Sequence, residues 1–239
     1  MFEKITIYLS IYIYLPMKKL LLSLALILFV TLLKAQSTFV RFATNKGDII
    51  VMLYDETPKH RDMFLNTIET GLYKNAEFNR VIKSFVSQGG ELDDTILNRE
   101  KLHPELGAER FAAEINPKLF HKKGALGAGR DDNPAKASYF TQIYLVTGKK
   151  QTDAQLDAIE QKKNRKISAA QRAIYKSIGG IPHLDQDYTV FGEIVAGMEV
   201  ADVINAVATD KNDVPLSPVV FNPIVLSKAE AAKLRKQLK

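Results

Sequence analysis

The chain has 239 residues, 46% hydrophobic and 25% charged, so it is long enough for one domain with a stable core and too apolar to be disordered. It has no cysteine, which excludes disulfide frameworks, thiolate metal sites and cysteine nucleophiles. Its four histidines, His60, His103, His121 and His183, lack the spacing of metal ligands, so we expect no metal site.

Residues 1–35 have the organisation of an export leader. The basic segment Met17-Lys18-Lys19 precedes the apolar run LLLSLALILFVTLL and the small residue Ala35, as in a secretory signal peptide. The run is short for a membrane span, which needs about 20 apolar residues. We therefore interpret Met17 as the true start and residues 1–16 as an upstream extension, and we expect a cleaved, periplasmic protein without stable membrane association. The alternative is an uncleaved membrane anchor, because residues 1–16 add a second apolar stretch.

Much of the net charge of +6 belongs to this leader. The leader holds four lysines and one glutamate, so 29 basic and 26 acidic residues remain in residues 36–239. Such a near balance does not indicate an anionic partner. We expect no nucleic acid to bind.

The first elements after the leader are two strands and a helix. Residues 38–54 are typical of two strands around the turn Asn45-Lys46-Gly47. A helix should follow with Thr57 as its N-cap, Pro58 at its first position and Gly71 at its end. The helix should place three side chains on one face, namely those of His60, Phe64 and Ile68.

The later chain alternates strands with long loops. Residues 78–90 should form strands, and residues 91–120 should form loops with at most short helices or strands. Further strands are expected around 125–127 and at 142–146, 189–195 and 223–229, with a helix over 196–207.

Residues 149–179 look like a helical insertion in this strand-rich chain. Two pairs of residues, Thr152 with Gln155 and Ser168 with Gln171, have capping-box spacing and predict two short helices. Their apolar stripe, at Leu156, Ile159, Ile174 and Ile178, fits either a solvated helical hairpin, which we favour, or a contact surface for a partner. A basic C-terminal tail follows at 229–239.

The stretch FNRVIKSFVSQGG, residues 78–90, resembles the cyclophilin signature, although Asn79 replaces its histidine. Four more blocks keep the family's order: GDIIVMLYDETPKHRDMFL before this stretch, and KKGALGAGRDDNP, TQIYLV and HLDQDYTVFGEIVAGMEVAD after it. The resemblance implies a mainly β fold over residues 36–228, a closed eight-stranded antiparallel barrel capped by helices. It also implies peptidyl-prolyl cis–trans isomerase activity on proline-containing polypeptides. We expect a monomer.

The chemistry of that reaction explains an arginine in the signature. An X–Pro amide rotates over a barrier of roughly 18–20 kcal/mol, because twisting destroys its resonance. The twisted nitrogen regains a lone pair, so a guanidinium aimed at it binds the transition state better than the ground state. Arg80 holds the matching position. No bond breaks, so we expect no cofactor.

The resemblance also assigns the rest of the site. Arg80, Phe85 and Gln88 would be catalytic. The proline ring would bind against Phe85, Val86, Tyr144 and Leu184, and the peptide backbone against Gln88 and Gln142. The remaining substrate-binding residues would be Gly129, Arg130, His183 and Tyr188. Each residue alone would fit a core or a solvated position, and only the joint order of the blocks favours a site.

Two other function classes remain as alternatives. A non-catalytic envelope chaperone or peptide-binding module could use the same fold, with the helical insertion and the basic tail as contact surfaces. A hydrolase or nucleotide-binding enzyme has little support, because Gly-x-Ser-x-Gly is absent and GALGAG lacks the spacing of a phosphate loop.

Overall fold

The structure is a computed structural model that describes residues 38–107 and 110–238. The described residues group into one compact unit. The predicted leader, residues 1–35, lies outside the described residues. Within the described ranges, no helix has both the length and the apolar character needed to cross a bilayer.

Nine strands form one antiparallel sheet in the order β3-β9-β1-β2-β8-β6-β7-β5-β4. Their bounds are β1 Thr38–Thr44, β2 Gly47–Leu53, β3 Ala76–Glu77, β4 Arg80–Val81, β5 Val86–Gly90, β6 Ala125–Ala128, β7 Gln142–Val146, β8 Val190–Ala196 and β9 Val220–Val225. The two edge strands, β3 and β4, are separated by only two residues of chain, so the sheet must curl to bring its edges together. The mainly β, antiparallel fold is therefore confirmed, as a curled sheet of nine strands in the described residues where a closed barrel of eight was expected.

The curled sheet encloses a large apolar core. Its fully buried side chains include Phe42, Phe64, Phe78 and Phe221. The rings of Phe78 and Phe221 lie 4.6 Å apart, and those of Phe42 and Phe221 lie 5.4 Å apart. Gly47, which takes a φ of 125°, makes the tight turn between β1 and β2 that the sequence predicts.

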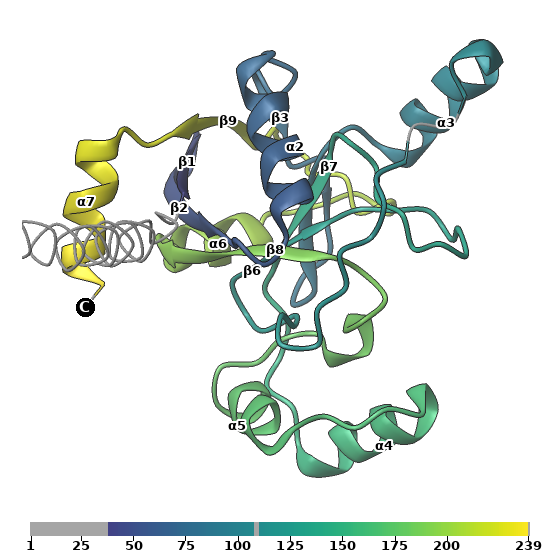
Figure 1. Cartoon of the computed structure of the whole chain (residues 1–239), viewed down its shortest axis with the longest axis vertical. Coiled ribbons are helices and arrows are strands. Elements are labelled where there is room, and N and C mark those ends of the chain that lie inside the picture. The colour runs from purple at the N-terminus through teal and green to yellow at the C-terminus, as the bar shows by residue number, and fades with distance from the viewer. Residues whose placement is uncertain (1–37, 108–109, 239) are drawn as a thin grey trace, which may run out of the picture. The chain divides into compact units, whose positions relative to one another are not determined.

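The helices lie around this sheet, as Figure 1 shows. They are α2 (Pro58–Glu69), α3 (Asp93–Leu102), α4 (Asp153–Lys163), α5 (Ala169–Ser177), α6 (Met198–Asn205) and α7 (Lys228–Gln237), with short 3₁₀ turns η1 (Pro104–Leu106) and η2 (Pro182–Leu184). The prediction for the start of α2 is wrong in one respect. Thr57 occupies the N-cap position, but its side chain makes no capping hydrogen bond.

Three helical segments differ from or extend the expectations. Within residues 91–120, α3 runs for ten residues, longer than the short pieces expected there. The insertion forms α4 and α5, and both predicted capping boxes are present. Most of the basic tail is the helix α7, whose Ala231 and Leu234 are buried together with Phe39 of β1.

Candidate active site

A row of directly paired residues crosses four neighbouring strands on the outer face of the sheet. Arg80 of β4 pairs directly with Gln88 of β5, and Gln88 pairs with Tyr144 of β7. Tyr144 in turn pairs with Gly127 of β6, where a Cβ would lie only 2.2 Å from the tyrosine ring. Directly paired residues of a sheet project to the same face, so the arginine, the amide and the ring form one continuous surface.

Tyr144 of this row also belongs to a second apolar cluster, which is separate from the core. Its buried members are Val86, Ala125, Tyr144, Val146, Ile181 and Val190. Phe85, Leu184 and Tyr188 pack against it while remaining partly exposed. An apolar surface left open beside polar groups is the usual form of a ligand site.

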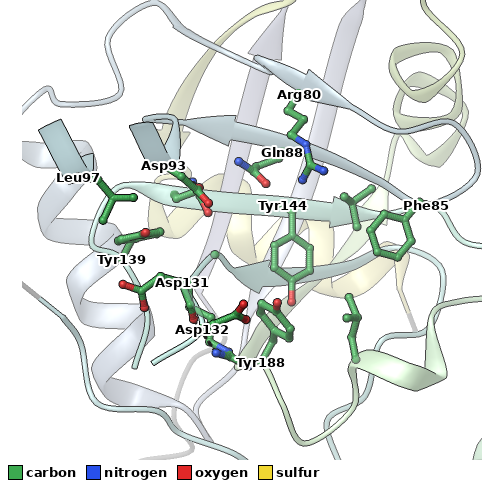
Figure 2. A pocket seen from close by; sticks show the side chains of 15 residues that line it. Arg80, Phe85, Gln88, Asp93, Leu97, Asp131, Asp132, Tyr139, Tyr144 and Tyr188 are labelled. Carbon is green, nitrogen blue, oxygen red and sulfur yellow. Dashed lines mark hydrogen bonds between the residues drawn. The ribbon is translucent and has the colours of Figure 1, made fainter. Parts of the chain in front are cut away.

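A cavity of about 380 Å³ opens over this cluster (Figure 2). Its lining residues are Arg80, Phe85, Val86, Gln88, Asp93, Leu97, Gly129, Arg130, Asp131, Asp132, Tyr139, Gln142, Tyr144, Leu184 and Tyr188. The structure thus brings together all of the predicted site residues except His183. Their individual roles remain predictions.

The Arg80 side chain lies at the cavity and is 44% exposed. Figure 2 shows its guanidinium beside Gln88 and on the side of the cavity where Tyr144 lies. Its ion pair with Asp213 is long, with 3.9 Å between Nε and Oδ2, and Asp213 is itself 42% exposed. The arginine is therefore not held in a buried structural ion pair, and its donors can reach a ligand in the cavity.

The Gln142 side chain is oriented by the chain that leads into α3. Its Nε2 donates to the carbonyl oxygen of Glu91 at 3.0 Å and to Oδ1 of Asp93 at 2.5 Å. A Cβ on Gly129 would lie 1.9 Å from Gln142 Oε1. Because residue 129 is a glycine, there is room for the side-chain amide of Gln142.

Arg130 forms hydrogen bonds to two loops that line the cavity, its own loop and the one that contains Asp187. Its Nε donates to the carbonyl oxygen of Asp187 at 2.7 Å, and its Nη1 donates to the carbonyl oxygen of Asp131 at 2.6 Å. Its guanidinium carbon lies 4.5 Å from the ring centroid of Tyr188. Arg130 thus holds Tyr188 against the cavity.

His183 is exposed and lies outside the cavity lining. Its ring stacks on that of Phe85, with 5.8 Å between centroids and 3° between planes. It therefore packs against a residue that lines the cavity. The position of the signature histidine is held by Asn79, whose Nδ2 donates to the carbonyl oxygen of Gly90 at the end of β5.

Five lining residues were missed by the sequence analysis, namely Asp93, Leu97, Asp131, Asp132 and Tyr139. Two of them directly follow the predicted pair Gly129-Arg130, which was a usable signal. The other three come from α3 and from the loop before β7, where no local pattern indicated a site. Among the described residues, no group of three or more histidine, aspartate or glutamate side chains is placed to hold a metal ion.

The fold and site together define a mainly β protein with an open cavity on the outer face of a curled sheet, lined by apolar side chains and by polar and charged ones. The family model described as "Cyclophilin type peptidyl-prolyl cis-trans isomerase/CLD" matches residues 39–224. The chain belongs to this family, and the predicted resemblance and the prediction of an isomerase are confirmed.

Similar proteins of known sequence carry the same family name. Peptidyl-prolyl cis-trans isomerase B of Escherichia coli is 27% identical over 193 residues, which cover 79% of this chain and 99% of the relative. A Streptococcus pyogenes protein, named as a bifunctional phosphatase/peptidyl-prolyl cis-trans isomerase, is 30% identical over 188 residues. The match covers 77% of this chain but only 38% of the streptococcal protein.

Solved structures support the same fold. The crystal structure of a cyclophilin type peptidyl-prolyl cis-trans isomerase of Cryptosporidium parvum matches with a TM-score of 0.57 and 20% sequence identity, covering 80% of this chain and 99% of that one. A second structure of that protein, in the presence of the dipeptide Ala-Pro, matches with a TM-score of 0.56 and 21% identity.

Proposed function

We propose that this isomerase accelerates rotation about X–Pro bonds of exported polypeptides, with Arg80 as the residue that stabilises the twisted amide. The observation that carries this proposal is the position of Arg80, half-exposed at the cavity and paired in the sheet with Gln88. A guanidinium keeps its charge at any working pH and offers fixed donors, so it can bind the nitrogen lone pair that appears only when the amide twists.

The cavity would hold the substrate while the bond rotates. The apolar side chains of Phe85, Val86, Leu184 and Tyr144 would enclose the proline ring, because that ring is itself apolar. Gln88 and the free Oε1 face of Gln142 would hold the neighbouring peptide backbone. With the ring fixed, rotation moves only the chain before proline.

The cellular role follows from the leader. A signal peptide of the predicted form directs a protein out of the cytoplasm, so the substrates would be exported proteins folding in a bacterial periplasm. We propose a monomer there. Mass analysis of the exported protein should find its N-terminus near residue 36, whereas an intact leader would support the membrane-anchored alternative.

The catalytic assignment is tested by a proline-isomerisation assay on the full chain and on Arg80→Ala. We expect kcat/KM to fall at least about tenfold, equivalent to about 1.4 kcal/mol of lost transition-state stabilisation, with the fold unchanged. Arg41→Ala is the matched control, since Arg41 is also a half-exposed strand arginine beside an aspartate, on β1. If Arg80→Ala retains the activity of this control, the assignment is wrong.

The chaperone alternative loses its main motivation. It relied on the apolar stripe of the insertion as a contact surface, but Leu156 of that stripe is fully buried, and Ile159 packs against the same cluster. Of the stripe, Ile178 alone is among the exposed large hydrophobic side chains.

A further inference from the structure

One wall of the cavity is attached from behind to the helical insertion. This wall segment, residues 181–188, carries His183, Leu184 and Tyr188. Three side chains of the insertion bond to it. The Tyr175 hydroxyl donates to Asp185 Oδ2 at 2.7 Å, Arg165 Nη2 donates to the carbonyl oxygen of Pro182 at 2.8 Å, and Lys163 Nζ lies 2.6 Å from Asp187 Oδ2.

The first of these hydrogen bonds is connected, through Asp185 and His121, to Tyr144, which we call the floor of the cavity. Asp185 Oδ1 accepts from the backbone N–H of His121 at 2.8 Å and from its ring Nδ1 at 2.9 Å. The other ring nitrogen, Nε2, lies 2.8 Å from the Tyr144 hydroxyl. Nδ1 is thus bonded to the carboxylate, and Nε2 shares the next hydrogen bond with the Tyr144 hydroxyl. A chain of hydrogen bonds thus runs from Tyr175 of α5 to Tyr144 of β7.

All four members of this chain are buried. Tyr175 and His121 are 0% exposed, Tyr144 is 4% exposed and Asp185 is 6% exposed. Buried polar groups are costly without partners, so each member restricts the positions that the next can take. The His121 and Tyr144 rings are also stacked, with 11° between their planes, while Tyr188 meets Tyr144 edge-on at 6.1 Å. Floor and wall are therefore fixed by the same contacts.

We propose that the helical insertion is a brace for the cavity, in which Tyr175, acting through Asp185 and His121, is a positioning residue for the Tyr144 floor and the 181–188 wall. None of these three side chains lines the cavity. The brace acts on the binding of the proline ring and not on the twisted amide, whose partner is Arg80. This inference rests on the proposed function, since it concerns the same site.

The test compares Tyr175→Phe with wild type in the full chain. The substitution removes one hydroxyl and keeps the ring that packs at 5.4 Å on Phe120, so the protein should fold. We expect KM to rise about threefold to tenfold and kcat to stay within about twofold, because the loss concerns ground-state and transition-state binding equally. Arg165→Ala breaks a second contact to the wall and should change KM in the same direction.

Tyr73→Phe is the matched control. Tyr73 is 2% exposed in the core of the sheet, and its hydroxyl has no hydrogen-bond partner. Removing it should leave KM unchanged. If Tyr175→Phe has the same KM as this control, or if only its kcat is reduced, the proposal of a brace is contradicted.

A second readout separates this inference from the proposed function. Side-chain NMR of labelled tyrosines should show shifts of the Tyr144 and Tyr188 signals in Tyr175→Phe but not in Tyr73→Phe, and titration with an Ala-Pro peptide should give weaker binding. These signals report on the cavity even if Arg80→Ala leaves the activity intact, which would contradict only the catalytic assignment. Unmoved signals in Tyr175→Phe would contradict only the brace.

Discussion

At the scale of single residues, Arg80 is constrained little by its surroundings. Its ion pair with Asp213 is 3.9 Å long and nearly half-exposed on both sides. Exposed pairs of this kind contribute at most about 1 kcal/mol, so the guanidinium can turn from the aspartate to a substrate at small cost. The backbone beneath it is better fixed, because the N–H of Val81 donates to the carbonyl oxygen of Asp213 at 2.8 Å.

Gly129 provides a residue-scale prediction. In Gly129→Ala the new methyl group would overlap the Gln142 side chain, which must shift away from its hydrogen bonds to Glu91 and Asp93. We expect KM to rise about threefold to tenfold, near the value of one hydrogen bond. Steady-state kinetics measures the change. In a Gln142→Ala background the same substitution should have no further effect, and an unchanged KM in the single variant would contradict the predicted role of Gln142.

At the scale of elements, Asp187 connects three parts of the chain. Its carboxylate lies 2.8 Å from Lys136 Nζ and 2.6 Å from Lys163 Nζ, so it joins the loop before β7, the wall segment and the helix α4. Burial alone would raise the pKa of Asp187, but the hydrogen bonds from the two lysines outweigh it and hold this pKa at about 2, against 3.8 ordinarily.

This lowered pKa predicts a pH dependence of stability. Because the folded pKa lies below the unfolded one, the ion pairs stabilise the protein fully above about pH 4 and lose their effect as the pH falls toward about 2. Asp187→Asn should therefore lower the free energy of unfolding by about 1 kcal/mol at pH 7, and by less as the pH falls below 4. Urea unfolding between pH 7 and pH 2.5 measures the difference. A constant difference over this range would contradict it, and Glu69→Gln, at the exposed end of α2, is the control.

At the scale of the whole molecule, one sheet separates two apolar clusters, of which one forms the core and the other lines the cavity. The inner cluster around Phe42, Phe64 and Phe221 is closed by the curl of the sheet. The outer cluster around Val86 and Tyr144 stays open at the cavity. Since adjacent residues of a strand face opposite sides, β6 and β7 supply both clusters.

This division predicts that the core and the site can be perturbed separately. Phe221→Ala removes a fully buried ring that contacts Phe42, Tyr73 and Phe78, and should cost about 3–5 kcal/mol of unfolding free energy. The KM of the remaining folded molecules should be unchanged. Phe140→Ala, at a ring that is 36% exposed, should cost far less. Denaturant titration gives both values, and equal losses would contradict this view of the core.

Local signals in the sequence determined much of this protein. Capping boxes at Thr152 and Ser168, the glycine turn at Gly47 and the alternating strands act over a few residues, so they could be predicted directly. The signature also located Arg80, Phe85 and Gln88, because its landmarks keep fixed spacing along one stretch of chain.

Tertiary structure decided what depends on contacts between distant residues. His121 and Asp185 are 64 positions apart, and Tyr73, Tyr139 or Tyr175 look alike as sequence, although only one of these three hydroxyls bonds to Asp185. The inward turn of Leu156, the contribution of Tyr139 to the cavity and the ninth strand likewise follow from packing. Such contacts join segments that are far apart in the sequence, and neither segment contains a local pattern that indicates the other. These contacts could therefore be found only in the folded structure.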